Sequence, residues 1–328
     1  MKVKVSELKQ QIYRALTKAG YTQSEAEKIG DVFLFGQMSG KTTHGLVRLF
    51  KGDDNILQKP GEGPLEIIEK SDASAHVIGK RNAGVLVAHV GMDTALEIAS
   101  RQKVGFVTTN GTYSTSGSLS YYLEQIALAG YIGIIFARSE AFVAPFNSAE
   151  ALFGTNPIGF SFPTEGSPLI FDMGTSIISF GAIISAATTG DTIPAHTALD
   201  KEGKETTDPN KALEGSVYSF DNSYKGSGLS MIVEIFGGVL AGAGFIDLHQ
   251  EDRWGNLFMV LSPELFMPLD TFKKRMTEFK DRMESAKTID GEKLRLPGVN
   301  TLLIRDQNLA DDEIEIEDEI LNEFYTYL

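Results

Sequence analysis

The middle of the chain alternates between helical and strand-like patterns of apolar residues, and this alternation constrains the fold more than any other feature. Apolar spacing of three and four residues predicts helices over residues 83–102 and 119–128. Short β-branched and aromatic runs predict strands at 104–109, 131–137, 158–162, 169–173 and 257–261. Alternating helices and strands pack as layers on a sheet, so we expect an α/β arrangement here.

Both ends of the chain carry helical patterns. Apolar spacing predicts helices over residues 5–19 and 269–283. Thr22 and Glu25 form a capping box, which begins another helix that runs to about Gly36. The ends therefore differ in character from the middle of the chain.

This difference predicts two domains. Because the two termini of a compact unit often lie close together, residues 1–75 and 265–328 are expected to form one discontinuous, mainly helical domain. Residues 76–264 form the α/β domain inserted into it. Within that domain, residues 190–220 are expected to be rich in loops.

Composition restricts the partners and the chemistry. Acidic residues outnumber basic ones 44 to 30, and the net charge of −14 repels nucleic acid and anionic membrane surfaces. With no cysteine, the chain has no disulfide, thiolate zinc site, iron–sulfur cluster or cysteine nucleophile. No signal-like or membrane-spanning stretch stands out, so we expect a cytoplasmic protein.

His44 and Arg48 are the strongest local signal for a site. They stand four residues apart on a short helix predicted over 44–51, with Thr43 as its cap, so both side chains project from one face. Histidine exchanges protons near neutral pH, and a guanidinium grips a carboxylate through two hydrogen bonds. The pair fits a 2-oxo or 2-hydroxy acid. Packing for His44 and a surface ion pair for Arg48 remain the alternative.

Other candidate sites are weaker. The remaining histidines show no metal-ligand spacing, so we predict no protein-bound metal. The glycine fingerprint of a Rossmann domain does not follow an early strand. A helix that starts at Gly226 and Gly228 would place free N–H groups beside Lys225, where an anion such as a pyrophosphate could bind. Alternatively, these are ordinary glycines at a helix boundary.

Five segments occur together in the order typical of one known family. They are 43–48 (THGLVR), 154–157 (GTNP), 172–176 (DMGTS), 224–229 (YKGSGL) and 296–298 (LPG). Through them the chain resembles the malate/L-lactate dehydrogenase-like oxidoreductases over nearly its whole length. Residues 1–16, 131–134, 179–181 and 296–298 look most similar to the 2,3-diketo-L-gulonate reductase branch.

The resemblance implies a homodimer with a non-Rossmann sheet domain that binds NAD, or NADP, inserted in a helical domain. It implies interconversion of a small 2-oxo acid and its 2-hydroxy acid, with His44 as the proton donor. We expect Arg48 to hold the substrate carboxylate. The positions that match the family's cofactor-binding residues are Ser139, Pro168, Leu169, Ile170, Phe171, Asp172, Met173, Gly174, Tyr224, Lys225, Gly298, Val299 and Asn300.

Four positions depart from the family pattern. Thr43 replaces a serine, Thr115 a second histidine, and Val299 an acidic residue, while Arg138 stands where asparagine is common and could attract a 2′-phosphate. The change at Thr115 motivates a second hypothesis, an inactive homologue that binds an effector or acts as a scaffold. A cofactor-free lyase with His44 as base is a third.

Overall fold

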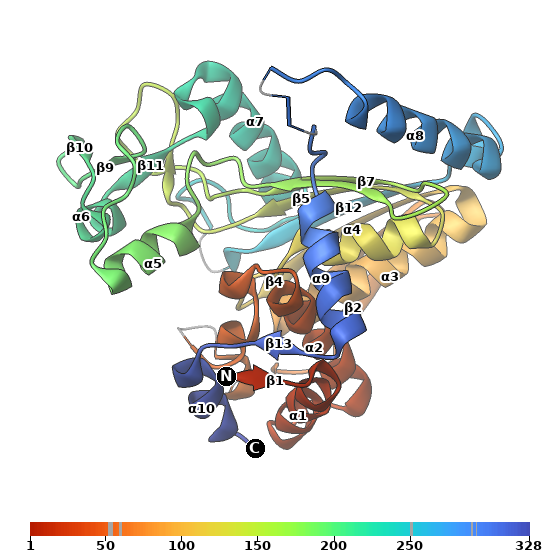
Figure 1. Cartoon of the computed structure of the whole chain (residues 1–328), viewed down its shortest axis with the longest axis horizontal. Helices are drawn as coiled ribbons and strands as arrows, with labels where there is room; N and C mark the ends of the chain where they lie inside the picture. The colour runs from red at the N-terminus through yellow and green to blue at the C-terminus, as the bar shows by residue number, and fades with distance from the viewer. Residues whose placement is uncertain (52–54, 59–60, 250–251, 290, 293) are drawn as a thin grey trace.

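A mixed seven-stranded sheet forms the centre of the computed structural model, which describes every residue except 52–54, 59–60, 250–251, 290 and 293 (Figure 1). The strand order is β2-β3-β4-β12-β5-β7-β8, and of these neighbours only β3 and β4 run parallel. The strands are β2 (Glu66–Ser71), β3 (Ser74–Asn82), β4 (Val104–Thr112), β5 (Ile132–Arg138), β7 (Ile158–Phe162), β8 (Leu169–Met173) and β12 (Gly255–Leu261). The five strands expected from the sequence are confirmed.

Helices cover both faces of this sheet. On one face lie α3 (Gly84–Gln102) and α4 (Leu119–Leu128), close to their predicted bounds (Figure 1). Against β5 on the other face packs α7 (Tyr224–Glu234), which continues as a π-helical turn over Ile235–Val239. The mixed α/β class expected from the alternation is thereby confirmed.

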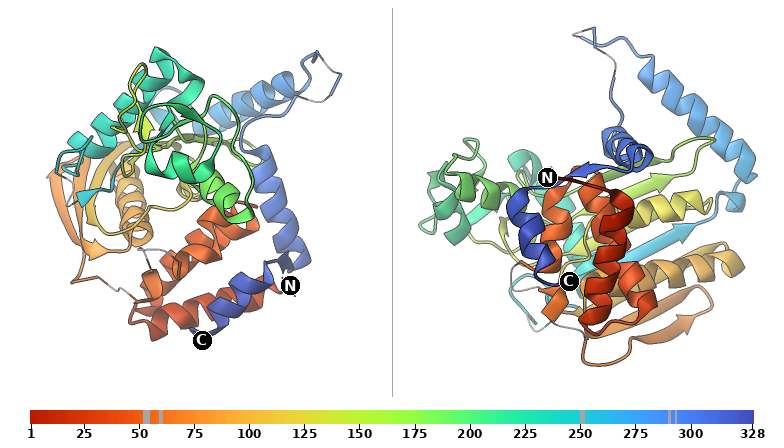
Figure 2. Two further views of the ribbon diagram at one scale, coloured as in Figure 1. Left: turned by 90° about the vertical axis from the view of Figure 1, so that its left-hand side faces the viewer. Right: turned by 60° about the horizontal axis from the view of Figure 1, so that its bottom comes forward.

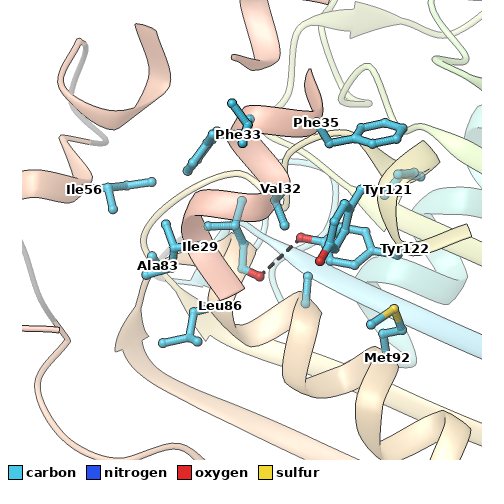
Figure 3. Close-up of a cluster of buried hydrophobic side chains, with 14 of the residues drawn as sticks. Ile29, Val32, Phe33, Phe35, Ile56, Ala83, Leu86, Met92, Tyr121 and Tyr122 are labelled. Atoms are coloured by element: carbon cyan, nitrogen blue, oxygen red, sulfur yellow. Dashed lines mark hydrogen bonds between the residues drawn. The ribbon is translucent and has the colours of Figure 1, made fainter. Parts of the chain in front are cut away.

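Buried side chains fix helix α2 (Gln23–Met38) to the layer formed by α3 and α4 (Figure 3). Val32 and Phe33 of α2 are fully buried, as is Tyr122 of α4. The Tyr122 hydroxyl lies 3.2 Å from the carbonyl oxygen of Val85 and 2.7 Å from that of Ser116. The ring of a buried tyrosine makes apolar contacts, and the hydrogen bonds of its hydroxyl fix the orientation of the ring. The end of α2, which leads to His44, is held in place by this core.

The two ends of the chain meet beside α1 (Val5–Lys18). Strand β1 (Lys2–Val3) pairs antiparallel with β13 (Ile314–Glu315), followed by α10 (Asp318–Tyr325), and Figure 2 shows both termini on this side. Burial of Leu8 and Ile12 on α1 and of Leu321 and Phe324 on α10 follows their apolar spacing.

Two elements bear on the proposed domain boundaries. Strand β2 precedes residue 75 and pairs with β3, so the first boundary runs through a hairpin. Helix α8 (Leu269–Glu284) projects from the end of the sheet and lies away from α1 (Figures 1 and 2). The division into two domains stays a prediction.

A smaller four-stranded sheet, with the order β10-β9-β11-β6, has a core of its own. The strands of this sheet are β6 (Val143–Ala144), β9 (Ala198–Leu199), β10 (Glu205–Thr206) and β11 (Ser216–Tyr218). The same region contains helices α5 (Phe180–Thr189) and α6 (Pro209–Glu214). Residues 190–220 are rich in loops, as expected, and the short strands and helix among these loops were not predicted because strands of two or three residues are too short to show a period. No helix in the described part of the chain is long and apolar enough to cross a membrane.

Candidate active site

A cavity of about 420 Å³ opens where the N-terminal region, the large sheet and the small sheet meet. Its lining residues are Thr43, His44, Arg48, Thr115, Ser116, Gly117, Ala137, Arg138, Ser139, Glu140, Ala141, Phe142, Thr155, Pro157, Ser179, Phe180, Gly181, Leu213 and Trp254. His44 and Arg48 therefore face one space large enough for a small ligand.

The backbone around His44 differs from the sequence prediction. Two short 3₁₀ turns, Thr42–His44 and Leu46–Leu49, replace the helix expected over 44–51. Gly45 separates them with φ −103° and ψ −148°, outside helical geometry. A Cβ atom on Gly36 of α2 would lie 2.2 Å from the carbonyl oxygen of His44. Close packing on α2, which local spacing does not reveal, sets the backbone here.

The His44 imidazole is positioned by the residue before it and is neutral at pH 7. Its Nδ1 lies 3.1 Å from Oγ1 of Thr43. Burial, together with the smaller effects of the Arg48 and Lys41 cations, lowers the pKa of His44 to about 4, and Asp172 acts in the opposite direction. The reference pKa of histidine predicted that His44 would exchange its proton near neutral pH. In this cavity the imidazole holds its proton only at lower pH.

Arg48 is anchored at one nitrogen and remains available at the others. Its Nε donates to the carbonyl oxygen of Thr43 at 3.0 Å. Across the described residues, no carboxylate lies within ion-pair distance of this guanidinium. A surface ion pair, the alternative considered for Arg48, is therefore not what the structure shows. Its free nitrogens can hold an anion in the cavity.

Asp172 belongs to a charged network behind His44. Its Oδ2 lies 3.0 Å from Nζ of Lys41 and accepts hydrogen bonds from the hydroxyl (2.6 Å) and the backbone N–H (3.1 Å) of Ser120. Burial raises the pKa of Asp172, but the Lys41 cation and the Ser120 hydroxyl outweigh it, so the net pKa is lowered. An ionised Asp172 thus faces His44. Neither Lys41 nor Ser120 was among the predicted site residues, since neither lies in a recognisable motif.

Arg138 has no part in binding an anion. Its side chain is fully buried, its Nε lies 3.0 Å from Oε1 of Glu234, and its two terminal nitrogens donate to the backbone oxygens of Ile246 and Arg253. The possibility that Arg138 attracts a 2′-phosphate is therefore wrong. No local pattern indicates its partner Glu234, which lies 96 residues away in the chain.

Hydroxyl groups line the remaining polar wall. The Ser139 hydroxyl lies 3.2 Å from Oγ1 of Thr155, and its backbone N–H donates to Oδ1 of Asn156 at 3.1 Å. Thr115, at the position of the second family histidine, also lines the cavity. No imidazole other than that of His44 is among the described lining residues.

The other predicted cofactor positions are not among the residues that line this cavity. They fall on the loop before β8 and on β8 itself, at the start of α7, and at the start of α9 (Val299–Asp311). Gly298, expected in a loop with Val299 and Asn300, is the N-cap of α9 with φ +77°. A Cβ atom there would lie 2.3 Å from the carbonyl oxygen of Ile170, so the helix start touches β8.

The side chains of these segments differ in their exposure to solvent. Ile170 is buried, whereas Phe171 is partly exposed and Tyr224 is 70% exposed. Lys225 is exposed and has no ion pair with any described residue. Helix α7 begins at Tyr224 with Ser223 as its cap, two residues before the predicted glycine pair. An uncommitted cation on the first turn of a helix fits the phosphate of a dinucleotide.

Comparisons with known proteins cover nearly the whole chain. The sequence model of the malate/L-lactate dehydrogenase family matches residues 3–324. L-sulfolactate dehydrogenase of Methanocaldococcus jannaschii is 32% identical, covering 96% of this chain and 93% of that protein. Ureidoglycolate dehydrogenase (NAD(+)) of Escherichia coli K12 is 30% identical, covering 100% and 95%.

Solved structures of other proteins share the fold of this chain. The sulfolactate dehydrogenase of M. jannaschii superimposes with a TM-score of 0.87 at 30% identity, covering 100% of this chain and 96% of that one. The malate dehydrogenase of Entamoeba histolytica gives a TM-score of 0.91 at 24% identity, covering 100% and 97%, a likeness of fold alone. The similarity thus extends across both sheets and both termini.

Proposed function

The chain belongs to the malate/L-lactate dehydrogenase family, and on this premise we propose that it interconverts a small 2-oxo acid and its 2-hydroxy acid with NAD or NADP. The observation that carries the proposal is the placement of His44 and Arg48 on one cavity. Arg48 binds the substrate carboxylate, which brings the neighbouring carbonyl oxygen to the imidazole.

The reaction divides between the cofactor and His44. A nicotinamide held in the site would supply or accept the hydride at the carbon that bears the oxygen. In reduction, protonated His44 gives its proton to that oxygen; in oxidation, neutral His44 removes the hydroxyl proton. Because its pKa is lowered to about 4, His44 is ready to act as the base at neutral pH.

Substrate binding favours the protonated form that reduction needs. The Arg48 cation is one of the causes that lower the pKa of His44. A substrate carboxylate on Arg48 offsets that charge, so the pKa of His44 rises when substrate binds. Asp172, held ionised by Lys41 and Ser120, stabilises the imidazolium.

The end of β8 and the starts of α7 and α9 form the proposed cofactor cradle. We expect the exposed Tyr224 and Lys225 to contact the cofactor, with Lys225 on its phosphate, and Gly298 brings the start of α9 against β8. The name of the ureidoglycolate dehydrogenase relative includes NAD(+), which supports a nicotinamide cofactor.

A homodimer is also part of the proposal. The outer side of α7 and its π-helical continuation exposes Met231, Ile235, Val239 and Leu240, each 42–56% accessible. An apolar strip of this kind marks an interaction surface. Light scattering after size exclusion should give twice the 35.7 kDa chain mass, and a single-chain mass would contradict the dimer.

A panel of 2-oxo acids with NADH and NADPH tests the proposed function. It includes pyruvate analogues and 2,3-diketo-L-gulonate, and the loss of nicotinamide absorbance is followed. We expect at least one acid to be reduced. Binding of cofactor in a fluorescence titration without turnover of any acid would instead support the inactive, effector-binding homologue.

A further inference from the structure

The cavity wall contains an unpaired positive charge, which influences the choice of substrate. Arg48 is the one cation of the described lining with no carboxylate partner, since Arg138 is buried against Glu234. Arg48 can pair with one carboxylate of a substrate. Any second anionic group would have to be met by the rest of the wall.

Beside the hydroxyl groups, one part of that wall is apolar. Phe142, Phe180, Leu213 and Trp254 supply apolar surface, and the rings of Phe142 and Phe180 meet edge to face with centroids 4.9 Å apart. An anion placed against this surface would lose hydration without gaining a partner.

The lining also contains a carboxylate, that of Glu140. It forms an ion pair with Arg253, and both side chains are about half exposed, so the pair lies at the rim of the cavity. The backbone oxygen of Arg253 is in turn held by the buried Arg138 guanidinium. Glu140 is thus fixed in place, and it neutralises the Arg253 cation at the rim.

Resting on the proposed function, we infer that Glu140 is a specificity-determining residue, and that the site selects 2-oxo acids with one carboxylate and an uncharged tail. Glu140 acts in two ways. It repels a second anionic group, and it occupies Arg253, which would otherwise bind one. Specificity commonly depends on such a repulsive element as well as on attractive contacts.

The inference is tested with 2-oxovalerate and 2-oxoglutarate, which have the same chain length and differ by the terminal carboxylate. Each acid is measured as a substrate and as a competitive inhibitor of the best substrate of the panel, so that binding is reported even where turnover is slow. The wild-type protein should favour 2-oxovalerate by at least about tenfold in kcat/KM or inhibition constant.

Two variants separate the parts of the argument. Glu140→Gln frees Arg253 and should narrow this preference by about fivefold, mainly through a gain on 2-oxoglutarate. Arg253→Gln leaves the Glu140 carboxylate uncompensated and should widen the preference. Glu97→Gln is the matched control, because Glu97 forms an exposed pair with Arg101 on α3, outside the cavity lining.

A wild-type preference for 2-oxoglutarate, or equal ratios in Glu140→Gln and Glu97→Gln, would overturn the inference while leaving the proposed function intact. If no 2-oxo acid of any kind were reduced or bound, the proposed function itself would fail, and the assignment to Glu140 with it.

Discussion

The pH dependence of turnover should be displaced far from the ordinary histidine range. Burial, together with the Arg48 and Lys41 cations, lowers the pKa of His44 to about 4 in the free protein. At pH 7 about one molecule in a thousand then carries the imidazolium. Because kcat/KM reports the ionisation of the free enzyme, kcat/KM for reduction should fall about tenfold per pH unit from roughly pH 5 upward.

The oxidation direction and the substrate complex give two further signatures. Oxidation needs the neutral imidazole, so its kcat/KM should already be on a plateau at pH 6 to 8. In the substrate complex, the carboxylate on Arg48 removes one cause of the lowered pKa. The profile of kcat for reduction should therefore break at a higher pH than that of kcat/KM.

Initial rates in both directions, at saturating cofactor and constant ionic strength between pH 4.5 and 8.5, provide the assay. The substrates are the 2-oxo acid found best in the panel and its 2-hydroxy acid. A kcat/KM for reduction that stays flat to about pH 6.5 before falling would show an ordinary histidine, and would refute the electrostatic account of the cavity.

Three substitutions test other parts of the account. Arg48→Lys keeps the charge but loses the planar fork, so steady-state kinetics should show KM for the 2-oxo acid raised at least about tenfold, and an unchanged KM would remove Arg48 from substrate binding. Lys225→Ala should weaken cofactor binding in a fluorescence titration while the KM of the acid changes little; unaltered nicotinamide affinity would exclude this lysine from the cradle. Glu234→Gln leaves the Arg138 charge buried without a counter-ion, and chemical denaturation should show a loss of about 3–5 kcal/mol in the free energy of unfolding. A loss below about 1 kcal/mol would contradict that role.

Much of the fold could be predicted because its elements are long and locally patterned. Helix α1 shows a clean apolar period, and the capping box of Thr22 and Glu25 is present as expected. Strands β5, β7 and β8 are short apolar runs with turn residues between them. The order of the strands was not predictable, since β12 pairs between β4 and β5 over long sequence separations.

The site was predictable in part. The four-residue spacing of His44 and Arg48 correctly brought them to one cavity, although they lie on two 3₁₀ turns and not on one helix. The backbone of α2 behind Gly45 imposes that geometry through tertiary packing. Asp172 was predicted as a cofactor residue, which stays a prediction, whereas the contacts of its carboxylate with Lys41 and Ser120 were not predicted. Partners that are distant in sequence leave no local pattern.

The central claim, that His44 donates the proton in reduction, is tested most directly by single-turnover reduction with His44→Gln. General acid catalysis contributes about 10² to 10⁴-fold, so the rate of nicotinamide oxidation should fall by about that factor while cofactor affinity is retained. His76→Gln, a histidine outside this cavity that contacts Thr108, is the control and should leave the rate unchanged. If His44→Gln instead keeps most of the wild-type rate, another group such as the Thr115 hydroxyl delivers the proton, and the account is wrong.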